Sequence, residues 1–275
     1  MARADRRSRG TAVKARKRFG QHFLEAAWVR RLTDVIAPGP DEAFLEIGPG
    51  RGALTRALAP RARSVLAIEI DRELAPALAA ASPPNVTVVE ADFLEADVAR
   101  LVAPWIPLRV AGNLPYNIST PILFRLLALA DEGRRFTDAT LMLQREEADR
   151  LAASPGSRTW GVLSACQQLW ADVEMVLTLP PGAFRPAPKV RSAVVRLRYR
   201  PARPPVSDPA LFTALVRAVF MQRRKMLGNA LAPFAATQGR EAAAAIEAAG
   251  LDARRRPETL ALEELARLAE VFASA

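Results

Sequence analysis

The chain has 275 residues, enough for one large α/β domain and a smaller appendage. Half of its residues are hydrophobic but fall into short periodic stretches, which excludes a membrane span and the apolar core of a signal peptide. The single cysteine, Cys166, excludes an internal disulfide and is typical of a reducing cytosol, so we expect a cytoplasmic protein. Its apolar neighbours predict that Cys166 is buried rather than nucleophilic.

The net charge of +10 is concentrated in two segments. Residues 1–18 carry eight basic side chains and one acidic one, and residues 185–203 carry seven basic side chains and no acid, so the remainder is mildly acidic. Such concentration is typical of a protein that binds a polyanion. The alternatives are a solubilising tail and a solvated sheet edge. A transit peptide is disfavoured because the N-terminal arm lacks an apolar helical face before Phe19.

Short apolar runs alternate with helical patterns through the first two-thirds of the chain. This alternation predicts an α/β fold with a mostly parallel, doubly wound sheet. The expected strands are residues 43–47, 64–70, 86–90, 108–111 and 139–143. Two later runs, residues 172–179 and 192–199, flank a proline-rich loop and are expected to form an antiparallel pair that closes the sheet edge.

A second proline-rich break, residues 201–209, precedes a purely helical pattern. We expect helices at residues 209–231, 240–249 and 260–272. The predicted organisation is a basic arm (1–18), an α/β domain (19–205) and a helical C-terminal domain (206–275).

Three glycines alternate directly after the first predicted strand, at Gly48, Gly50 and Gly52. Glycine permits a tight turn there and lets backbone amides approach a ligand. Glu69 ends the next strand, where a carboxylate can accept hydrogen bonds from ribose hydroxyls, and Asp92 follows the third strand, suited to an adenine amino group. The alternative for both acids is an exposed position at a strand end.

The spacing of the glycines and the acid at Glu46 favour S-adenosylmethionine over a nicotinamide dinucleotide. An oxidoreductase would also need a catalytic acid or base, but the only histidine is His22 and no Tyr-x-x-x-Lys pattern is present. We expect Asp71 to cap the following helix rather than to bind the cofactor, and we expect no metal.

The tetrapeptide Asn113-Leu114-Pro115-Tyr116 follows a predicted buried strand. The Asn113 side-chain oxygen and the Leu114 carbonyl can accept hydrogen bonds from an exocyclic amine, Pro115 fixes the turn, and Tyr116 can stack on a base. These residues predict a catalytic site for methylation of a nucleobase amine. The alternative is an ordinary Asn-Pro turn.

With these motifs, the chain resembles the family of ribosomal RNA adenine N6,N6-dimethyltransferases over nearly all of residues 17–275. The resemblance rests on segments 17–24, 46–52, 69–71, 113–119, 184–190 and 223–225. It implies a Rossmann-like methyltransferase domain with a small helical domain. The implied reaction moves four methyl groups from S-adenosylmethionine onto two adjacent adenines near the 3′ end of small-subunit rRNA, in a pre-30S particle, as part of ribosome biogenesis.

The resemblance also implies roles for individual residues. Cofactor contacts carry over to His22, Leu24, Gly48, Glu69, Asp92 and Asn113. Phe184 would be a second aromatic that sandwiches the target adenine against Tyr116, with a core position beneath the proline-rich loop as the alternative. From the two basic segments and the motif at residues 223–225, contacts with RNA are expected at Arg16, Lys17, Arg18, Arg185, Lys189, Arg191, Arg223, Arg224 and Lys225. We expect the protein to be monomeric.

Two positions depart from the family pattern. His22 stands where relatives often have asparagine, so a backbone contact is expected there rather than a side-chain contact. Arg191 stands where aspartate is common, which adds a cation beside the target loop.

Two other functions remain open. A related class methylates a large-subunit rRNA adenine and confers macrolide resistance, but the combination of residues 183–186 with residues 223–227 favours the small-subunit enzyme. A non-catalytic ribosome-assembly factor would use the same surface only to bind RNA, and the intact Gly48, Glu69, Asp92 and Asn113 argue against it.

Overall fold

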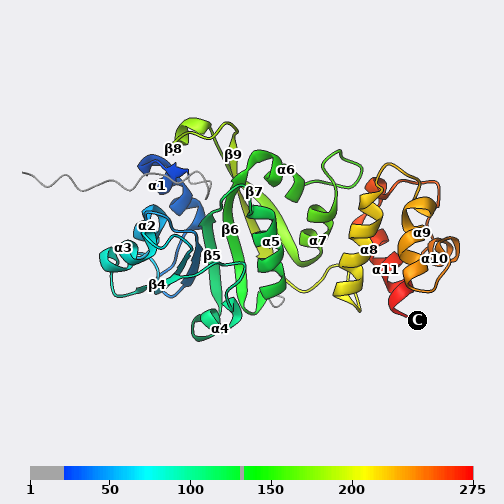
Figure 1. Ribbon diagram of the computed structural model, residues 1–275, viewed down its shortest axis with the longest axis horizontal. Helices are drawn as coiled ribbons and strands as arrows, with labels where there is room; N and C mark the ends of the chain where they lie inside the picture. Colours follow the sequence, from blue (N-terminus) through cyan, green and yellow to red (C-terminus); the bar gives the residue numbers. More distant parts are fainter. Residues whose placement is uncertain (1–21, 131–132, 275) are drawn as a thin grey trace, which may run out of the picture.

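The computed structural model describes residues 22–130 and 133–274. The predicted arm and its candidate RNA contacts Arg16, Lys17 and Arg18 lie outside the described residues. At the centre is a seven-stranded sheet with the order β4-β3-β2-β5-β6-β9-β7 (Figure 1). Its strands are β2 (Ala43–Ile47), β3 (Ser64–Glu69), β4 (Val86–Glu90), β5 (Leu108–Asn113), β6 (Phe136–Gln144), β7 (Ala171–Leu179) and β9 (Ser192–Tyr199).

The first five strands of the sheet run parallel, and the last two are antiparallel to their neighbours. Strand β9 inserts between β6 and β7, so it is an interior strand and β7 forms the edge. The predicted α/β class and the antiparallel closing pair are both confirmed. Because the first five strands are parallel, their carboxyl ends meet at one rim of the sheet.

Helices cover both faces of the sheet. One face packs against α4 (Val98–Val102), α5 (Ser119–Leu129), α6 (Arg145–Leu151) and part of α7 (Val162–Trp170). The other face packs against α1 (Ala26–Ile36) and α2 (Ala53–Leu58), with α3 (Leu74–Ala81) beside α2 (Figure 1). Strand β2 contributes to both layers, since Leu45 faces the first layer and Phe44 the second.

A short two-stranded ribbon lies apart from the main sheet. Strand β1 (Phe23–Leu24) pairs antiparallel with β8 (Phe184–Arg185), with Leu24 opposite Phe184. This pairing joins residues 23–24, which follow the predicted arm, to the proline-rich loop. The ribbon lies at the end of the sheet where the carboxyl ends of the parallel strands meet (Figure 1).

The C-terminal part is helical, as predicted, but one expected helix is divided. Residues 209–231 form α8 (Pro209–Met221) and α9 (Leu227–Thr237), separated by a turn, so the prediction of a single helix was wrong. The first amides of α9 bond instead to the segment before α11, since Leu227 N donates to Arg255 O at 2.7 Å. Two further helices follow, α10 (Ala242–Ala248) and α11 (Leu262–Ala273).

A hydrophobic cluster joins α7 to these C-terminal helices. It contains Cys166, which is buried, as predicted. Burial raises the pKa of the Cys166 thiol to about 11, so the thiol is protonated and unreactive at neutral pH. The domain boundary near residue 205 stays a prediction. Within the described ranges, no helix is long and apolar enough to cross a bilayer.

Candidate active site

The parallel strands place the predicted ligand groups in a row. Adjacent strands β4, β3, β2 and β5 end near Asp92, Glu69, Gly48 and Asn113, respectively. These groups are far apart in the sequence, but the strand order makes them neighbours along one rim. The sheet therefore presents cofactor candidates and the target-site candidate side by side.

The glycine loop is tied to the next strand by hydrogen bonds from two of its backbone amides. Gly48 N donates to Ile68 O at 2.9 Å, and Gly50 N donates to Glu69 Oε2 at 2.8 Å. Gly52 has φ +72°, and a Cβ on it would lie 2.3 Å from Leu78 Cδ1. A larger residue at Gly52 would therefore meet both backbone strain and a clash with α3.

The Glu69 carboxylate is oriented by backbone amides on both sides. Its second oxygen, Oε1, accepts from Asp71 N at 2.9 Å. Burial raises the pKa of Glu69, and the hydrogen bonds from Asp71 and Gly50 oppose that rise by favouring the charged form. Asp71 itself accepts from Glu73 N at 2.9 Å and Leu74 N at 3.4 Å, at the start of α3, as its predicted capping role requires.

Asp92 lies in a turn directly after β4. Its Oδ1 accepts from Leu94 N at 2.8 Å, which holds the side chain on the rim. The neighbouring Phe93 is buried in the core cluster and anchors this turn. Asp92 is half-buried, so its carboxylate is accessible to a ligand.

Glu46 lies beneath the glycine loop and is almost fully buried. Burial raises the pKa of its carboxyl to about 7, and the nearby charge of Glu69 adds to the rise. Its Oε2 atom has no hydrogen-bond partner among the described residues. Glu46 therefore binds a proton at a pH where ordinary carboxylates are ionised.

The space above the glycine loop is partly bounded by the β1 segment. A Cβ built on Gly50 would lie 3.3 Å from the Phe23 ring, whereas a Cβ on Gly48 would meet nothing within 4 Å. The Arg51 guanidinium lies 4.3 Å from the centre of the Phe23 ring. The loop thus has a hydrophobic cover at Gly50 and open space at Gly48.

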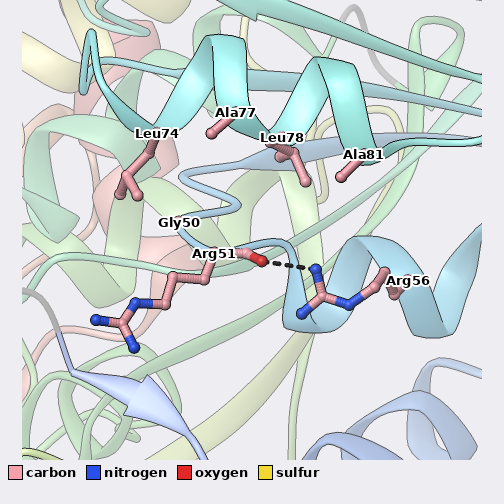
Figure 2. A pocket seen from close by; sticks show the side chains of 7 residues that line it. All are labelled: Gly50, Arg51, Arg56, Leu74, Ala77, Leu78 and Ala81. Atoms are coloured by element: carbon pink, nitrogen blue, oxygen red, sulfur yellow. Dashed lines mark hydrogen bonds between the residues drawn. The ribbon is translucent and has the colours of Figure 1, made fainter. Parts of the chain in front are cut away.

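A cavity of about 230 Å³ opens beside this loop, between α2 and α3 (Figure 2). Beside it, Arg56 Nη1 in α2 donates to the Arg51 carbonyl of the loop at 2.8 Å (Figure 2). The cavity is lined by Gly50, Arg51, Arg56, Leu74, Ala77, Leu78 and Ala81. Apart from Gly50, none of the predicted ligand groups lines it, so this cavity adjoins the rim without forming the predicted cofactor site.

Asn113 is held by the backbone of the β1 segment. Its Nδ2 donates to His22 O at 2.8 Å, across 91 positions of sequence. Because a carbonyl oxygen can only accept, this bond sets the amide orientation and directs Oδ1 away from His22. Asn113 is half-buried, so Oδ1 is available as an acceptor at the rim.

Tyr116 is held at its hydroxyl and covered on one face. Its hydroxyl shares a 2.5 Å hydrogen bond with Ser192 Oγ, at the start of β9, and burial raises the pKa of the phenol. The His22 ring stacks on Tyr116 with 5.6 Å between ring centroids and 25° between planes. His22 Nδ1 lies 2.7 Å from the carbonyl oxygen of Pro186, which anchors the imidazole to the proline-rich loop.

The structure places Phe184 in the core position that was the alternative to a base clamp. Its side chain is fully buried in the cluster formed by α1, α2 and the sheet, and no ring contact joins it to Tyr116 among the described residues. The pairing of β8 with β1 places this ring inward, opposite Leu24. In this conformation Phe184 occupies the core position that the sequence left open, and His22 is the ring beside Tyr116.

Comparisons with known proteins identify the family of the chain. A model of the family described as ribosomal RNA adenine dimethylase matches residues 12–274. The chain belongs to this family. A family relative from Chromohalobacter salexigens, named ribosomal RNA small subunit methyltransferase A, is 45% identical over 270 residues, covering 95% of this chain and 93% of the relative. A relative of the same name from Geobacter metallireducens is 42% identical over 276 residues, covering 96% and 98%.

Solved structures show the same architecture. The 23S rRNA methyltransferase ErmE matches with a TM-score of 0.66 at 30% identity, covering 91% of this chain and 99% of that structure. A dimethyladenosine transferase from Plasmodium falciparum matches with a TM-score of 0.72 at 22% identity, covering 90% and 96%, which supports the fold alone. Like its family, the chain therefore combines a Rossmann-like sheet with C-terminal helices.

The structure divides the basic candidates into paired and unpaired groups. Arg185 forms a 3.1 Å ion pair with Glu25, and Arg223 forms a 2.7 Å ion pair with Glu258. The other described candidates, Lys189, Arg191, Arg224 and Lys225, are exposed. Arg223 is therefore a weaker candidate for a phosphate contact than the residues that follow it.

The basic segment of β9 is partly neutralised by acids on neighbouring strands. Arg198 pairs with Glu174 at 3.0 Å, and Arg200 pairs with Asp172 at 2.7 Å. Since β9 is an interior strand, arginines in and just after it have acidic neighbours on β7. The positive charge of residues 185–203 that is available to bind a polyanion is therefore smaller than their net charge of +7.

Sequence reasoning missed two residues at this site. Ser192 holds the Tyr116 hydroxyl, and Phe23 covers Gly50. Phe23 lies within the motif at residues 17–24, so the sequence did contain an indication that Phe23 belongs to the site. Nothing local marks Ser192, because its role depends on a partner 76 positions away.

Proposed function

We propose that this protein transfers methyl groups from S-adenosylmethionine to N6 of two adjacent adenines near the 3′ end of small-subunit rRNA, producing N6,N6-dimethyladenosines. The observation that carries the proposal is the position of Asn113 and Tyr116 at the end of β5, beside the glycine loop at the end of β2. An amine acceptor and a stacking ring are thus adjacent to a loop suited to a nucleotide-like cofactor.

The rim groups fit S-adenosylmethionine. Glu69 would accept hydrogen bonds from the ribose hydroxyls, Asp92 would accept from the adenine amino group, and the open space at Gly48 would admit the methionine part against the backbone. His22 and Leu24, in the segment that covers this loop, would contribute through their backbone. When bound, S-adenosylmethionine supplies an electrophilic methyl group on a sulfonium centre.

The chain's own residues would then orient the target amine. Asn113 Oδ1 and the Leu114 carbonyl accept its two N–H groups, which localises the nitrogen lone pair and directs it toward the methyl donor. Leu114 is fixed for this task, because its N–H donates to Met142 O at 3.1 Å and Pro115 restricts the turn after it. Orientation of this kind can supply about 7–11 kcal/mol of a barrier, so no strong general base is needed.

Tyr116 would stack on the flipped adenine. Base stacking on an aromatic side chain contributes about 1–3 kcal/mol, comparable with the few kcal/mol needed to take a base out of its stack. The hydrogen bond to Ser192 holds the ring in place. The His22 ring covers one face of Tyr116, so an adenine that stacked on that face would have to displace the imidazole or separate the two rings.

Small-subunit rRNA is favoured over large-subunit rRNA by the relatives. Those named for the small subunit are 45% and 42% identical to this chain, whereas the 23S rRNA methyltransferase ErmE is 30% identical. The exposed Lys189, Arg191, Arg224 and Lys225 would contact phosphates. We further propose that a cytoplasmic monomer acts on a pre-30S particle, which light scattering and methylation of assembly intermediates would test.

The decisive experiment incubates the protein with labelled S-adenosylmethionine and, separately, purified small and large subunits that lack the modification. We expect label on two adjacent adenines near the 3′ end of small-subunit rRNA. Label confined to large-subunit rRNA would replace this proposal with the macrolide-resistance type of reaction. Tight particle binding without label on either subunit would support the purely RNA-binding alternative.

A further inference from the structure

Glu147 is a buried carboxylate with no role in the reaction described so far. It lies in the first turn of α6 and is only 8% exposed. Its Oε2 accepts a short hydrogen bond from Ser119 Oγ, and its Oε1 accepts one from Thr120 Oγ1. Both carboxylate oxygens are therefore bound by hydroxyl groups of a single partner element.

These two hydroxyls begin the helix that follows the target loop. Ser119 and Thr120 are the first two residues of α5, and the loop from Asn113 to Ile118 precedes them directly. Ser119 Oγ also lies 3.3 Å from the Tyr116 carbonyl. Whatever fixes the start of α5 thus fixes the carboxyl end of the segment that carries Tyr116.

The rest of the loop is anchored to the same part of the fold. The Leu114 N–H bonds to Met142 in β6, and the Tyr116 hydroxyl bonds to Ser192 in β9. In the sheet Ser192 lies opposite Gln144, the last residue of β6, and α6 starts at the next residue. Glu147 in α6 supplies a further anchor. Because α6 directly follows β6, this anchor and the bond from Leu114 to Met142 come from one continuous segment.

We propose that Glu147 is a positioning residue that sets the loop bearing Asn113 and Tyr116 through Ser119 and Thr120; this inference rests on the proposed function. A buried carboxylate is costly unless it is hydrogen-bonded, and hydrogen bonds to a charged acceptor are about twice as strong as neutral ones. A charged acceptor therefore holds the two hydroxyls more firmly than a neutral amide would. Firm placement matters, because a shift of about 1 Å at a reacting group can cost about a hundredfold in rate.

Two measurements on the full-length protein test this role with Glu147→Gln, which keeps the shape and removes the charge. The first is the single-turnover methylation rate on unmodified small subunits at saturating cofactor and particle. We expect it to fall about ten- to a hundredfold, while the cofactor Kd changes less than twofold. The second is hydrogen exchange, which we expect to become faster in residues 113–120 and to stay unchanged in α9.

Matched variants separate positioning from a general loss of stability. Glu146→Gln is the control, because Glu146 is exposed in the same helical turn and pairs only with Arg150 among the described residues. We expect it to behave as the wild type in both measurements. Ser119→Ala should reproduce part of the loss in rate, and combining it with Glu147→Gln should cost less than the product of the two single losses.

The outcomes distinguish this inference from the function on which it rests. If the wild type labels another RNA, the proposed function fails and the rate comparison is repeated on that RNA. If it labels none, hydrogen exchange still decides whether Glu147 holds the loop. An unchanged exchange pattern, or faster exchange in residues 113–120 with an unchanged single-turnover rate on a labelled RNA, would overturn the positioning role.

Discussion

The imidazole of His22 stacks on the phenol ring of Tyr116, with 5.6 Å between ring centroids. The backbone carbonyl of the same residue accepts the Asn113 amide. One residue of the β1 segment thus contacts both groups proposed to receive the target adenine. Its carbonyl orients the Asn113 amide, and its ring covers one face of Tyr116, where a base could stack.

Removing the His22 ring should make base binding easier. Aromatic pairs contribute about 0.5–1.5 kcal/mol, so His22→Ala is expected to strengthen binding of the flipped base about two- to tenfold. The backbone carbonyl remains, so the rate at saturating RNA should change little. Fluorescence of 2-aminopurine at the target position in an RNA fragment measures this binding. Weaker binding in His22→Ala would mean that the ring helps to hold the base instead of covering its site.

Removing the Asn113 amide should abolish transfer without releasing the RNA. We expect Asn113→Ala to lower the single-turnover methylation rate by about a hundredfold or more, with RNA affinity within a few-fold because phosphate contacts lie elsewhere. Asn113→Asp should not restore activity, because a carboxylate would face the His22 carbonyl. Asn229→Ala, at an exposed position of α9, is the matched control. Full methylation by Asn113→Ala would refute the proposed role of the amide.

Truncating Phe184 distinguishes a core residue from a base clamp. Because its side chain is fully buried, Phe184→Ala is expected to lower the free energy of unfolding by about 3–5 kcal/mol. Chemical denaturation measures this loss, and Tyr116→Ala, at a half-buried ring, provides the comparison. A stable Phe184→Ala protein with weakened 2-aminopurine binding would instead restore Phe184 to the clamp.

Glu46 should make stability depend on pH. Its pKa of about 7 in the folded protein lies above its ordinary value of 4.5, so the native state binds a proton that the unfolded state lacks between these values. Below pH 4.5 the Glu46 carboxyl is protonated in both states, so the folded protein is not destabilised by a buried charge. As pH rises from 4.5 through 7 this advantage is lost, because the unfolded state ionises first and the native state must then bury a carboxylate. Glu46→Gln should therefore raise the free energy of unfolding by up to about 3 kcal/mol at pH 8 and change it little near pH 4.5. Glu247→Gln, on the exposed face of α10, should show no such dependence.

The N-terminal arm should contribute to RNA affinity through charge. Residues 1–18 carry a net charge of +7, so deletion of residues 1–16 is expected to weaken binding of small subunits and flatten its salt dependence. Each lost phosphate contact should reduce the slope of log affinity against log salt by about 0.7–0.9. An arm of equal length with glutamine at its basic positions separates charge from length. An unchanged slope in both variants would mean that the arm does not contact the RNA.

The sequence alone determined the elements that depend on local patterns. Short apolar runs alternating with helical patterns predicted the seven strands of the main sheet. Parallel strands imply a shared rim, so Gly48, Glu69, Asp92 and Asn113 could be placed together in advance. Tertiary structure alone decided the inward side of Phe184, the ring beside Tyr116 and the anchor at Glu147. Each of these depends on a particular partner distant in sequence, such as Pro186 for His22, 164 positions away. Local propensity carries no information about such contacts, because they form only when the packed layers bring the segments together.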